Sequence, residues 1–108
     1  NSNLITCFAN DYGYENWVSE AIKSNCYKGD LIILISSSGT SKNIINAAKY
    51  CQKSNLDLIT FSGFNIGNPL NKLGSVNFHI MSDNYNHIEM SHNIILVSIV
   101  DIFANKLA

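Results

Sequence analysis

The sequence predicts an α/β fold, in which helices cover a parallel sheet to form a three-layer sandwich. Short apolar runs at residues 31–35, 56–61 and 76–81 have the length of strands, and segments of helical periodicity lie before, between and after them. Helices that alternate with strands form right-handed crossovers, which place the strands parallel. The length of 108 residues is typical of a single domain, and no linker or repeat divides the sequence.

The first half of the chain contains two predicted helices and one predicted strand. Residues 14–24 and 42–53 carry apolar side chains at helical spacing, among them Trp17 and Ile22 in the first segment and Ala47 and Cys51 in the second. Between them the continuous run LIILI at 31–35 is typical of a strand that is buried on both faces. Residues 4–9 fit a strand or a short helix equally well.

The second half continues the alternation. Residues 56–61 are expected to form a second strand, and the loop 62–68 leads to Pro69, which suits the first position of a short helix over 68–73. A third strand is expected over 76–81 and a long helix over 88–107. The apolar stripe of this last helix is wider than one core-facing side requires, which predicts an oligomer.

Composition excludes several classes of protein. With a net charge of −1, the chain has no basic surface for nucleic acid and no polybasic segment for anionic lipid. The apolar run at 94–104 has about half the length that spans a bilayer, so no membrane partner is expected. Cys7, Cys26 and Cys51 are odd in number and widely spaced, which favours free thiols in a reducing cytoplasm.

The segment between the first strand and the second helix is a candidate phosphate site. Five of its six positions, 36–41, carry hydroxyl groups, and the sixth is Gly39, which tolerates unusual backbone angles. The unpaired N–H groups and the dipole at a helix start attract anions. The alternative is a capping serine followed by a tight turn. A Walker loop is excluded, because the Gly-Lys-Ser/Thr ending is missing.

Two segments resemble one known family. The stretch GDLIILISSSGTSKNIINAAKYC resembles the signature of SIS (sugar isomerase) domains, a strand followed by S-x-S-G-x-S/T and a helix. Residues 10–14 (NDYGY) resemble the N-D-[FY]-G-[FY] segment of the phosphoheptose isomerases within that family. The resemblance covers essentially the whole chain. It implies a flavodoxin-like architecture, with residues 1–108 as the C-terminal portion of one larger domain whose N-terminal part is missing.

The resemblance also implies an activity and a set of site residues. Such enzymes are cytoplasmic homotetramers that convert sedoheptulose 7-phosphate to D-glycero-D-manno-heptose 7-phosphate through an enediol, for bacterial surface glycans, and some bind zinc. By position in these motifs, the resemblance implies six substrate-binding residues: Asn10, Asp11, Ser36, Ser37, Ser38 and Ser41. Glu89 falls where the family usually has Gln, a substrate or metal contact, so a metal would take at most Glu89. Aldose–ketose isomerisation needs a base and an acid, and we expect Glu89 and His92 to supply these catalytic roles.

The chain departs from the family pattern in two places. Val97 stands where the family has a second histidine that serves as catalytic acid/base. A catalytic Glu and a GNGGS loop, which the family takes from a preceding half-domain, are absent from this sequence. These departures leave a second function open, a non-catalytic module that binds a sugar phosphate and regulates a partner.

Each candidate residue also has a plainer explanation. Glu89 and His92 are three residues apart and share a helix face, but an acid at a helix start and a surface histidine need no function. His87 is a substitute for the missing histidine, expected just before the last helix or at its edge. Asp11 is either a sugar contact or the N-cap of the first helix, and His79 in its strand is expected to pack or face solvent.

Overall fold

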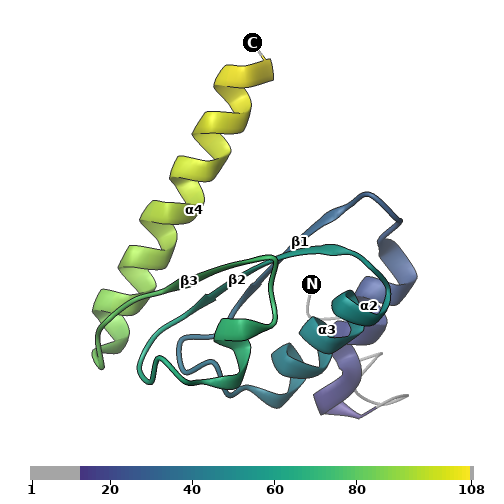
Figure 1. Cartoon of the computed structure of the whole chain (residues 1–108), viewed down its shortest axis with the longest axis horizontal. Helices are drawn as coiled ribbons and strands as arrows, with labels where there is room; N and C mark the ends of the chain where they lie inside the picture. Colours follow the sequence, from purple (N-terminus) through teal and green to yellow (C-terminus); the bar gives the residue numbers. More distant parts are fainter. Residues whose placement is uncertain (1–12, 108) are drawn as a thin grey trace.

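The computed structural model describes residues 13–107, in which helices and strands alternate (Figure 1). The 3₁₀ turn η1 (Tyr14–Asn16) runs into helix α2 (Trp17–Asn25), and strand β1 (Leu31–Ile35) and helix α3 (Lys42–Lys53) follow. Strand β2 (Asp57–Ser62), the 3₁₀ turn η2 (Pro69–Lys72), strand β3 (Val76–His79) and helix α4 (Tyr85–Leu107) come next. The predicted order of elements is confirmed for these residues.

The three strands form one parallel sheet in the order β1-β2-β3. Ile35 at the end of β1 lies beside Phe61 of β2, and Phe61 in turn lies beside Phe78 of β3. Because neighbouring parallel strands need a crossover, α3 connects β1 to β2, and the segment with η2 connects β2 to β3. All three strands therefore end at one edge of the sheet, where the loop after β1 also lies.

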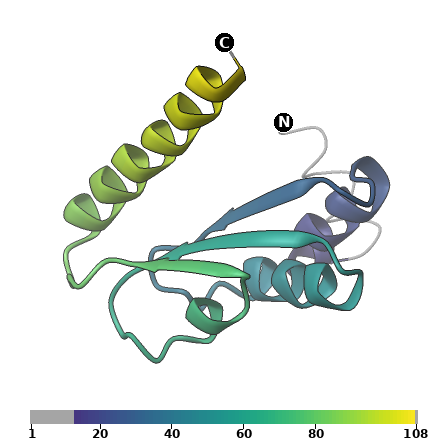
Figure 2. The same ribbon diagram turned by 45° about the horizontal axis from the view of Figure 1, so that its top comes forward.

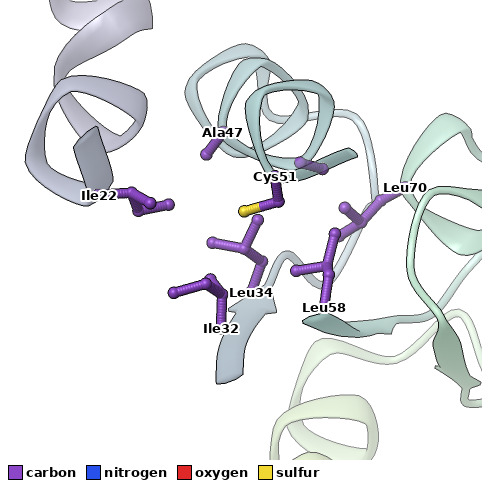
Figure 3. Close-up of a cluster of buried hydrophobic side chains, with 8 residues drawn as sticks. Ile22, Ile32, Leu34, Ala47, Cys51, Leu58 and Leu70 are labelled. Atoms are coloured by element: carbon purple, nitrogen blue, oxygen red, sulfur yellow. The ribbon is translucent and has the colours of Figure 1, made fainter. Parts of the chain in front are cut away.

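The core lies between one face of the sheet and helices α2 and α3 (Figure 3). Side chains alternate along a strand, so Ile32 and Leu34 point into this core while Leu31 and Ile35 stay largely exposed. Ala47 and the other small core residues of α3 are fully buried and let the helix approach the sheet closely. Burial of apolar surface stabilises this layer by about 25 cal/mol for each Å² that is removed from water.

Two of the three cysteines lie in this layer and are free thiols. Burial first, and the neighbouring Cys26 second, raise the pKa of Cys51 to about 11. Burial also raises the pKa of the Cys26 thiol, with a smaller contribution from Asp30. Both thiols are therefore protonated at neutral pH, and the prediction of free thiols is confirmed for Cys26 and Cys51, while Cys7 lies outside the described residues.

The opposite face of the sheet is covered at one end only. Phe61 is fully buried beneath the first turns of α4, with its ring against those of His92 and Phe78. Leu31, Ile35 and Val76 on the same face are between 42% and 47% exposed. The prediction that β1 is buried on both faces is therefore not met by the described residues, because α4 diverges from the sheet (Figure 2).

Helix α4 begins at Tyr85, three residues before its predicted start, because Asn84 caps it. The Asn84 Oδ1 atom accepts hydrogen bonds from the N–H groups of Asn86 (2.9 Å) and His87 (3.2 Å). Such a cap satisfies donors that a helix start leaves unpaired. His87 therefore lies within the first turn of α4, not before the helix.

Most of α4 lies away from the rest of the chain. On length and composition alone it is the one helix within residues 13–107 that is long and apolar enough to cross a membrane. It also carries Glu89, His92 and Asp101, and its first turns pack on the sheet. Many of its other apolar side chains are half exposed or more, among them Ile94, Val97, Val100, Ile102 and Phe103.

Candidate functional site

The hydroxyl-rich segment at residues 36–41, here called the serine loop, joins the end of β1 to the start of α3. It therefore lies at the carboxyl edge of the sheet, where parallel α/β folds bind their ligands. Gly39 has a φ of +69° and is buried. This left-handed backbone angle strains any side chain with a Cβ atom, which explains the glycine at this position.

One serine of the loop, Ser36, makes its side-chain hydrogen bonds within the loop itself. Ser36 is only 6% exposed. Its Oγ atom donates a hydrogen bond to Ser41 Oγ (3.1 Å) and accepts one from the Gly39 N–H (3.1 Å). Its own N–H donates to the carbonyl of Phe61 on the neighbouring strand (3.0 Å). Ser36 therefore holds the loop in shape and ties it to β2.

The outer hydroxyls form the rim of the loop. Ser38 Oγ and Thr40 Oγ1 are hydrogen bonded at 2.8 Å, and the Thr40 N–H donates to Ser38 Oγ (3.2 Å). Ser41 occupies the N-cap position of α3, but its side chain makes no capping hydrogen bond. The cap residue therefore leaves the first N–H groups of α3 unsatisfied, although the Ile44 N–H donates to Asn43 Oδ1 (2.9 Å). Unsatisfied N–H groups at a helix start are the arrangement that binds anions.

Charged side chains around the start of α3 would contribute little to the attraction of a phosphate. No acidic residue lies in the first turn of α3. Lys42 Nζ lies 3.6 Å from a Glu15 carboxylate oxygen, with both side chains largely exposed. A pocket of about 420 Å³ separates η1 from the start of α3 and is lined by Tyr14, Glu15 and Ser41 among others. An anion would thus be bound mainly by neutral hydroxyl and N–H groups.

A second groove connects the serine loop to α4. It has a volume of about 400 Å³, within the range of roughly 300–1,000 Å³ that small-molecule sites occupy. It is lined by residues from the end of β1, the serine loop and α4, namely Ile35, Ser37, Glu89, His92, Asn93 and Leu96. Glu89 is exposed on α4. The fold thus places a loop hydroxyl and two candidate proton-transfer groups on one groove.

His92 is buried, not a surface residue. It is 3% exposed, and its ring lies against Phe61. Its Nε2 atom lies 2.8 Å from the carbonyl oxygen of Ser62. Because a carbonyl only accepts, Nε2 carries the hydrogen and donates. Nδ1 is buried and has no hydrogen-bond partner among residues 13–107.

A zinc site is not complete within the described residues. No three His, Cys, Asp or Glu side chains of residues 13–107 lie together as a metal site, whereas protein zinc sites use three or four such ligands. His92 has one ring nitrogen hydrogen bonded to Ser62 and the other buried. These residues alone therefore do not fit a zinc ion.

The remaining predicted residues fall in different places. Asn10 and Asp11 lie outside the described residues. His79 packs within the fold, with Nε2 3.2 Å from the Phe64 carbonyl oxygen. His87 is exposed on the first turn of α4, and Val97 is 50% exposed further along it.

The structure adds two polar residues that the sequence did not single out as site residues. Asn93 lines the groove with Glu89, and Asn68 packs against Gly39 from the loop after β2. The only sequence signal for Asn68 is its place before Pro69, which marks a helix cap.

A larger pocket, of about 530 Å³, lies at the opposite edge of the sheet. It is lined by residues around the starts of β2 and β3, including Gln52, Asp57 and Gly74. The amino ends of parallel strands are not where such folds bind ligands. The serine loop and the groove beside it are therefore the candidate site.

Known proteins match most of this chain in sequence. The model of the SIS domain family matches residues 4–104. The phosphoheptose isomerase of Sulfurimonas denitrificans is 34% identical over 106 residues, which are 98% of this chain and 54% of that protein. That of Aliarcobacter butzleri is 32% identical over 107 residues, 99% of this chain and 56% of that protein. The chain thus spans about half the length of the curated relatives it matches.

Solved structures show the same fold. The phosphoheptose isomerase of Neisseria gonorrhoeae superposes with a TM-score of 0.85 at 24% identity, over 94% of this chain and 57% of that one. The structure of a phosphoheptose isomerase from Francisella tularensis gives the same score and identity, over 55% of its chain. The predicted α/β fold with a parallel sheet is therefore confirmed.

Proposed function

Because this chain belongs to the SIS domain family, we propose that it forms part of a sugar-phosphate isomerase of the phosphoheptose isomerase type. The observation that carries the proposal is the groove shared by Ser37 and Glu89, beside a hydroxyl-rich helix start. The name of the relatives, phosphoheptose isomerase, supports a heptose phosphate as the substrate. By the family resemblance this would be sedoheptulose 7-phosphate, with D-glycero-D-manno-heptose 7-phosphate as the product. The product would feed bacterial surface glycans.

The serine loop would bind the phosphate group. Ser38 and Ser41 offer hydroxyls at its rim, with the first N–H groups of α3 beside them. Ser37 lies on the groove side, and Ser36 holds the loop in shape from beneath. Each hydrogen bond to a charged acceptor contributes about 1.5–3 kcal/mol, so a few of them bind a phosphate without a lysine or arginine. Asn10 and Asp11 remain proposed contacts to the sugar.

Glu89 is the proposed proton-transfer group. In the ketose, the carboxylate would take a proton from C1. The electrons of that C–H bond would form the C1–C2 double bond of the enediolate, and the π electrons of the C2=O bond would move to O2. The proton would then return to C2, while the hydroxyl proton moves from O1 to O2, which leaves an aldehyde at C1. One carboxylate on the groove can make both transfers. Because Glu89 is exposed, the proton that it holds can exchange with water between the two transfers.

His92 is proposed to support this step by holding α4. Its hydrogen bond to Ser62 and its contact with Phe61 fix the helix turn that follows Glu89. Direct proton transfer by His92 stays a prediction. A zinc ion would take at most Glu89 from the described residues and would need other ligands from elsewhere, and no proposed step involves it.

The uncovered apolar surfaces support a homo-oligomer, a tetramer by the family resemblance. The exposed side of α4 and the open face of the sheet would each be covered by protein, either the rest of a longer chain or a second copy. A cytoplasmic location is proposed on the same resemblance and on the free thiols.

The test is isomerisation in heavy water. The full-length protein is incubated with sedoheptulose 7-phosphate in D₂O, with and without added zinc, and the product is analysed by NMR. An enediol mechanism predicts deuterium at C2 of the aldose. Glu89→Gln is expected to lower kcat by roughly 10²–10⁴-fold. The matched control Glu20→Gln changes an acid on α2 and should leave kcat unchanged.

Three results would contradict the proposal. Absence of conversion in all conditions, together with measurable binding of the sugar phosphate, would favour the regulatory module that Val97 also suggests. Full activity of Glu89→Gln would move the proton-transfer role to another residue. Absence of both binding and conversion would remove the sugar-phosphate assignment.

A further inference from the structure

Asn68 is a buried amide that reaches the serine loop from another strand connection. It is 3% exposed and lies between β2 and η2. Its Nδ2 atom donates to Ser62 Oγ (3.1 Å), the Gly63 carbonyl (3.3 Å) and the Asn65 carbonyl (2.8 Å). Its Oδ1 atom accepts from the Asn71 N–H (3.0 Å) and caps η2. The side chain is therefore held rigidly from both ends.

The same amide packs against the glycine of the serine loop. A Cβ atom added at Gly39 would overlap the carboxamide of Asn68. Beside this contact, the Leu70 N–H donates to the Gly39 carbonyl (3.2 Å). The loop after β2 thus touches the serine loop at the one residue that adopts a positive φ there.

Ser62 extends the connection to α4. Its hydroxyl oxygen accepts a hydrogen bond from Asn68 Nδ2, and its carbonyl oxygen accepts one from His92 Nε2. Ser62 is fully buried. A continuous set of contacts therefore runs from Gly39 through Asn68 and Ser62 to His92, and it joins the serine loop to the helix that carries Glu89.

We infer that Asn68 is a positioning residue, which holds the serine loop in its phosphate-binding conformation. This inference rests on the proposed function, because it assigns a role toward the same phosphate site. The physical reason is that a loop of small residues has many accessible conformations. A rigid amide packed on Gly39 excludes the loop conformations in which the hydroxyl and N–H groups point apart. The loop therefore binds phosphate without the entropy cost of ordering it at the time of binding.

The test uses Asn68→Ser in the full chain. Serine keeps an oxygen that can cap η2, but it removes the amide donors and the contact with Gly39. Inorganic phosphate and sedoheptulose 7-phosphate are titrated by calorimetry, and the variant is expected to bind both roughly 10-fold more weakly. The affinity for unphosphorylated sedoheptulose should not change.

The matched control is Asn71→Ser on the same loop. It removes a hydrogen bond from Asn71 Nδ2 to the Ile66 carbonyl (2.9 Å) and leaves the Asn68 amide against Gly39 in place. Phosphate affinity should therefore stay at the wild-type value. In a double-mutant cycle, Gly39→Ala should cost less affinity in the Asn68→Ser background, since the shorter side chain leaves room for the added methyl group.

The outcomes separate this inference from the proposed function. Wild-type chain that binds no phosphate contradicts the proposed function itself. Wild-type binding with equal affinity in Asn68→Ser overturns the role of Asn68 alone. Thermal melting monitors folding, and loss of the fold in Asn68→Ser but not in Asn71→Ser would make Asn68 a stability residue and also overturn the inference.

Discussion

Serines of similar appearance in the serine loop have different surroundings. Ser36 is buried and bonded on both sides of its hydroxyl, whereas Ser37 lines the groove beside α4. A buried hydroxyl that loses its partners is costly, whereas a group at the surface regains water when its contacts are lost. The two residues should therefore respond differently to the same substitution.

Ser36→Ala is expected to lower the free energy of unfolding by about 1–2 kcal/mol, because it removes one of the two acceptors of the Gly39 N–H and the donor to Ser41. Ser37→Ala, the matched control, should change it by less than about 0.5 kcal/mol. Urea denaturation followed by circular dichroism measures both values. Equal effects of the two substitutions would mean that Ser36 does not hold the loop.

At the scale of elements, α4 is attached to the sheet by a short segment only. Ile88 is fully buried and packs against Gly63, where an added Cβ would overlap it. Tyr85 contacts the ring of Phe64, and His92 contacts Phe61 and Ser62. These contacts span about two helical turns, and they fix the position of Glu89 between them.

Ile88→Ala should therefore loosen the attachment of α4 and lower the free energy of unfolding by about 2–4 kcal/mol, the usual cost of removing a buried isoleucine side chain. Ile66→Ala is the matched control, since Ile66 is 63% exposed on the loop after β2. It should cost less than about 0.5 kcal/mol. Chemical denaturation compares the two, and a similar cost for both would contradict the attachment described here.

At the scale of the whole molecule, apolar surface is left uncovered in two places. One is the face of the sheet around Leu31, Ile35 and Val76, and the other is the outer part of α4. Soluble monomers rarely expose apolar patches beyond a few hundred Å². The low charge of the chain, with 14% charged residues, adds little to keep such surfaces apart.

We therefore expect the protein to assemble through α4. The double variant Val100→Asp/Phe103→Asp places charges on side chains that are 58% and 54% exposed, and it should reduce the mass measured by light scattering after gel filtration. Tyr27→Asp is the control, because Tyr27 is 77% exposed on the loop after α2. An unchanged mass in the double variant would exclude α4 from the interface.

Local patterns in the sequence determined the order of the elements, the bounds of β1 and α3, and the position of the serine loop. Helical and strand periodicities reflect contacts between near neighbours and one buried face, so a single segment carries them. Turn residues such as Gly39 and Pro69 act through their own backbone angles. The family resemblance, which rests on the same segments, was confirmed by the match over residues 4–104.

Only the tertiary structure decided which site residues meet. The bond from His92 to Ser62 joins positions 30 residues apart, and Asn68 reaches Gly39 from the far side of β2. Neither contact leaves a periodic trace in the sequence, because each depends on how a loop and a helix pack on the sheet. The burial of Ser36 beside the exposed Ser41 likewise depends on the neighbouring strand, because the Ser36 N–H donates to the Phe61 carbonyl.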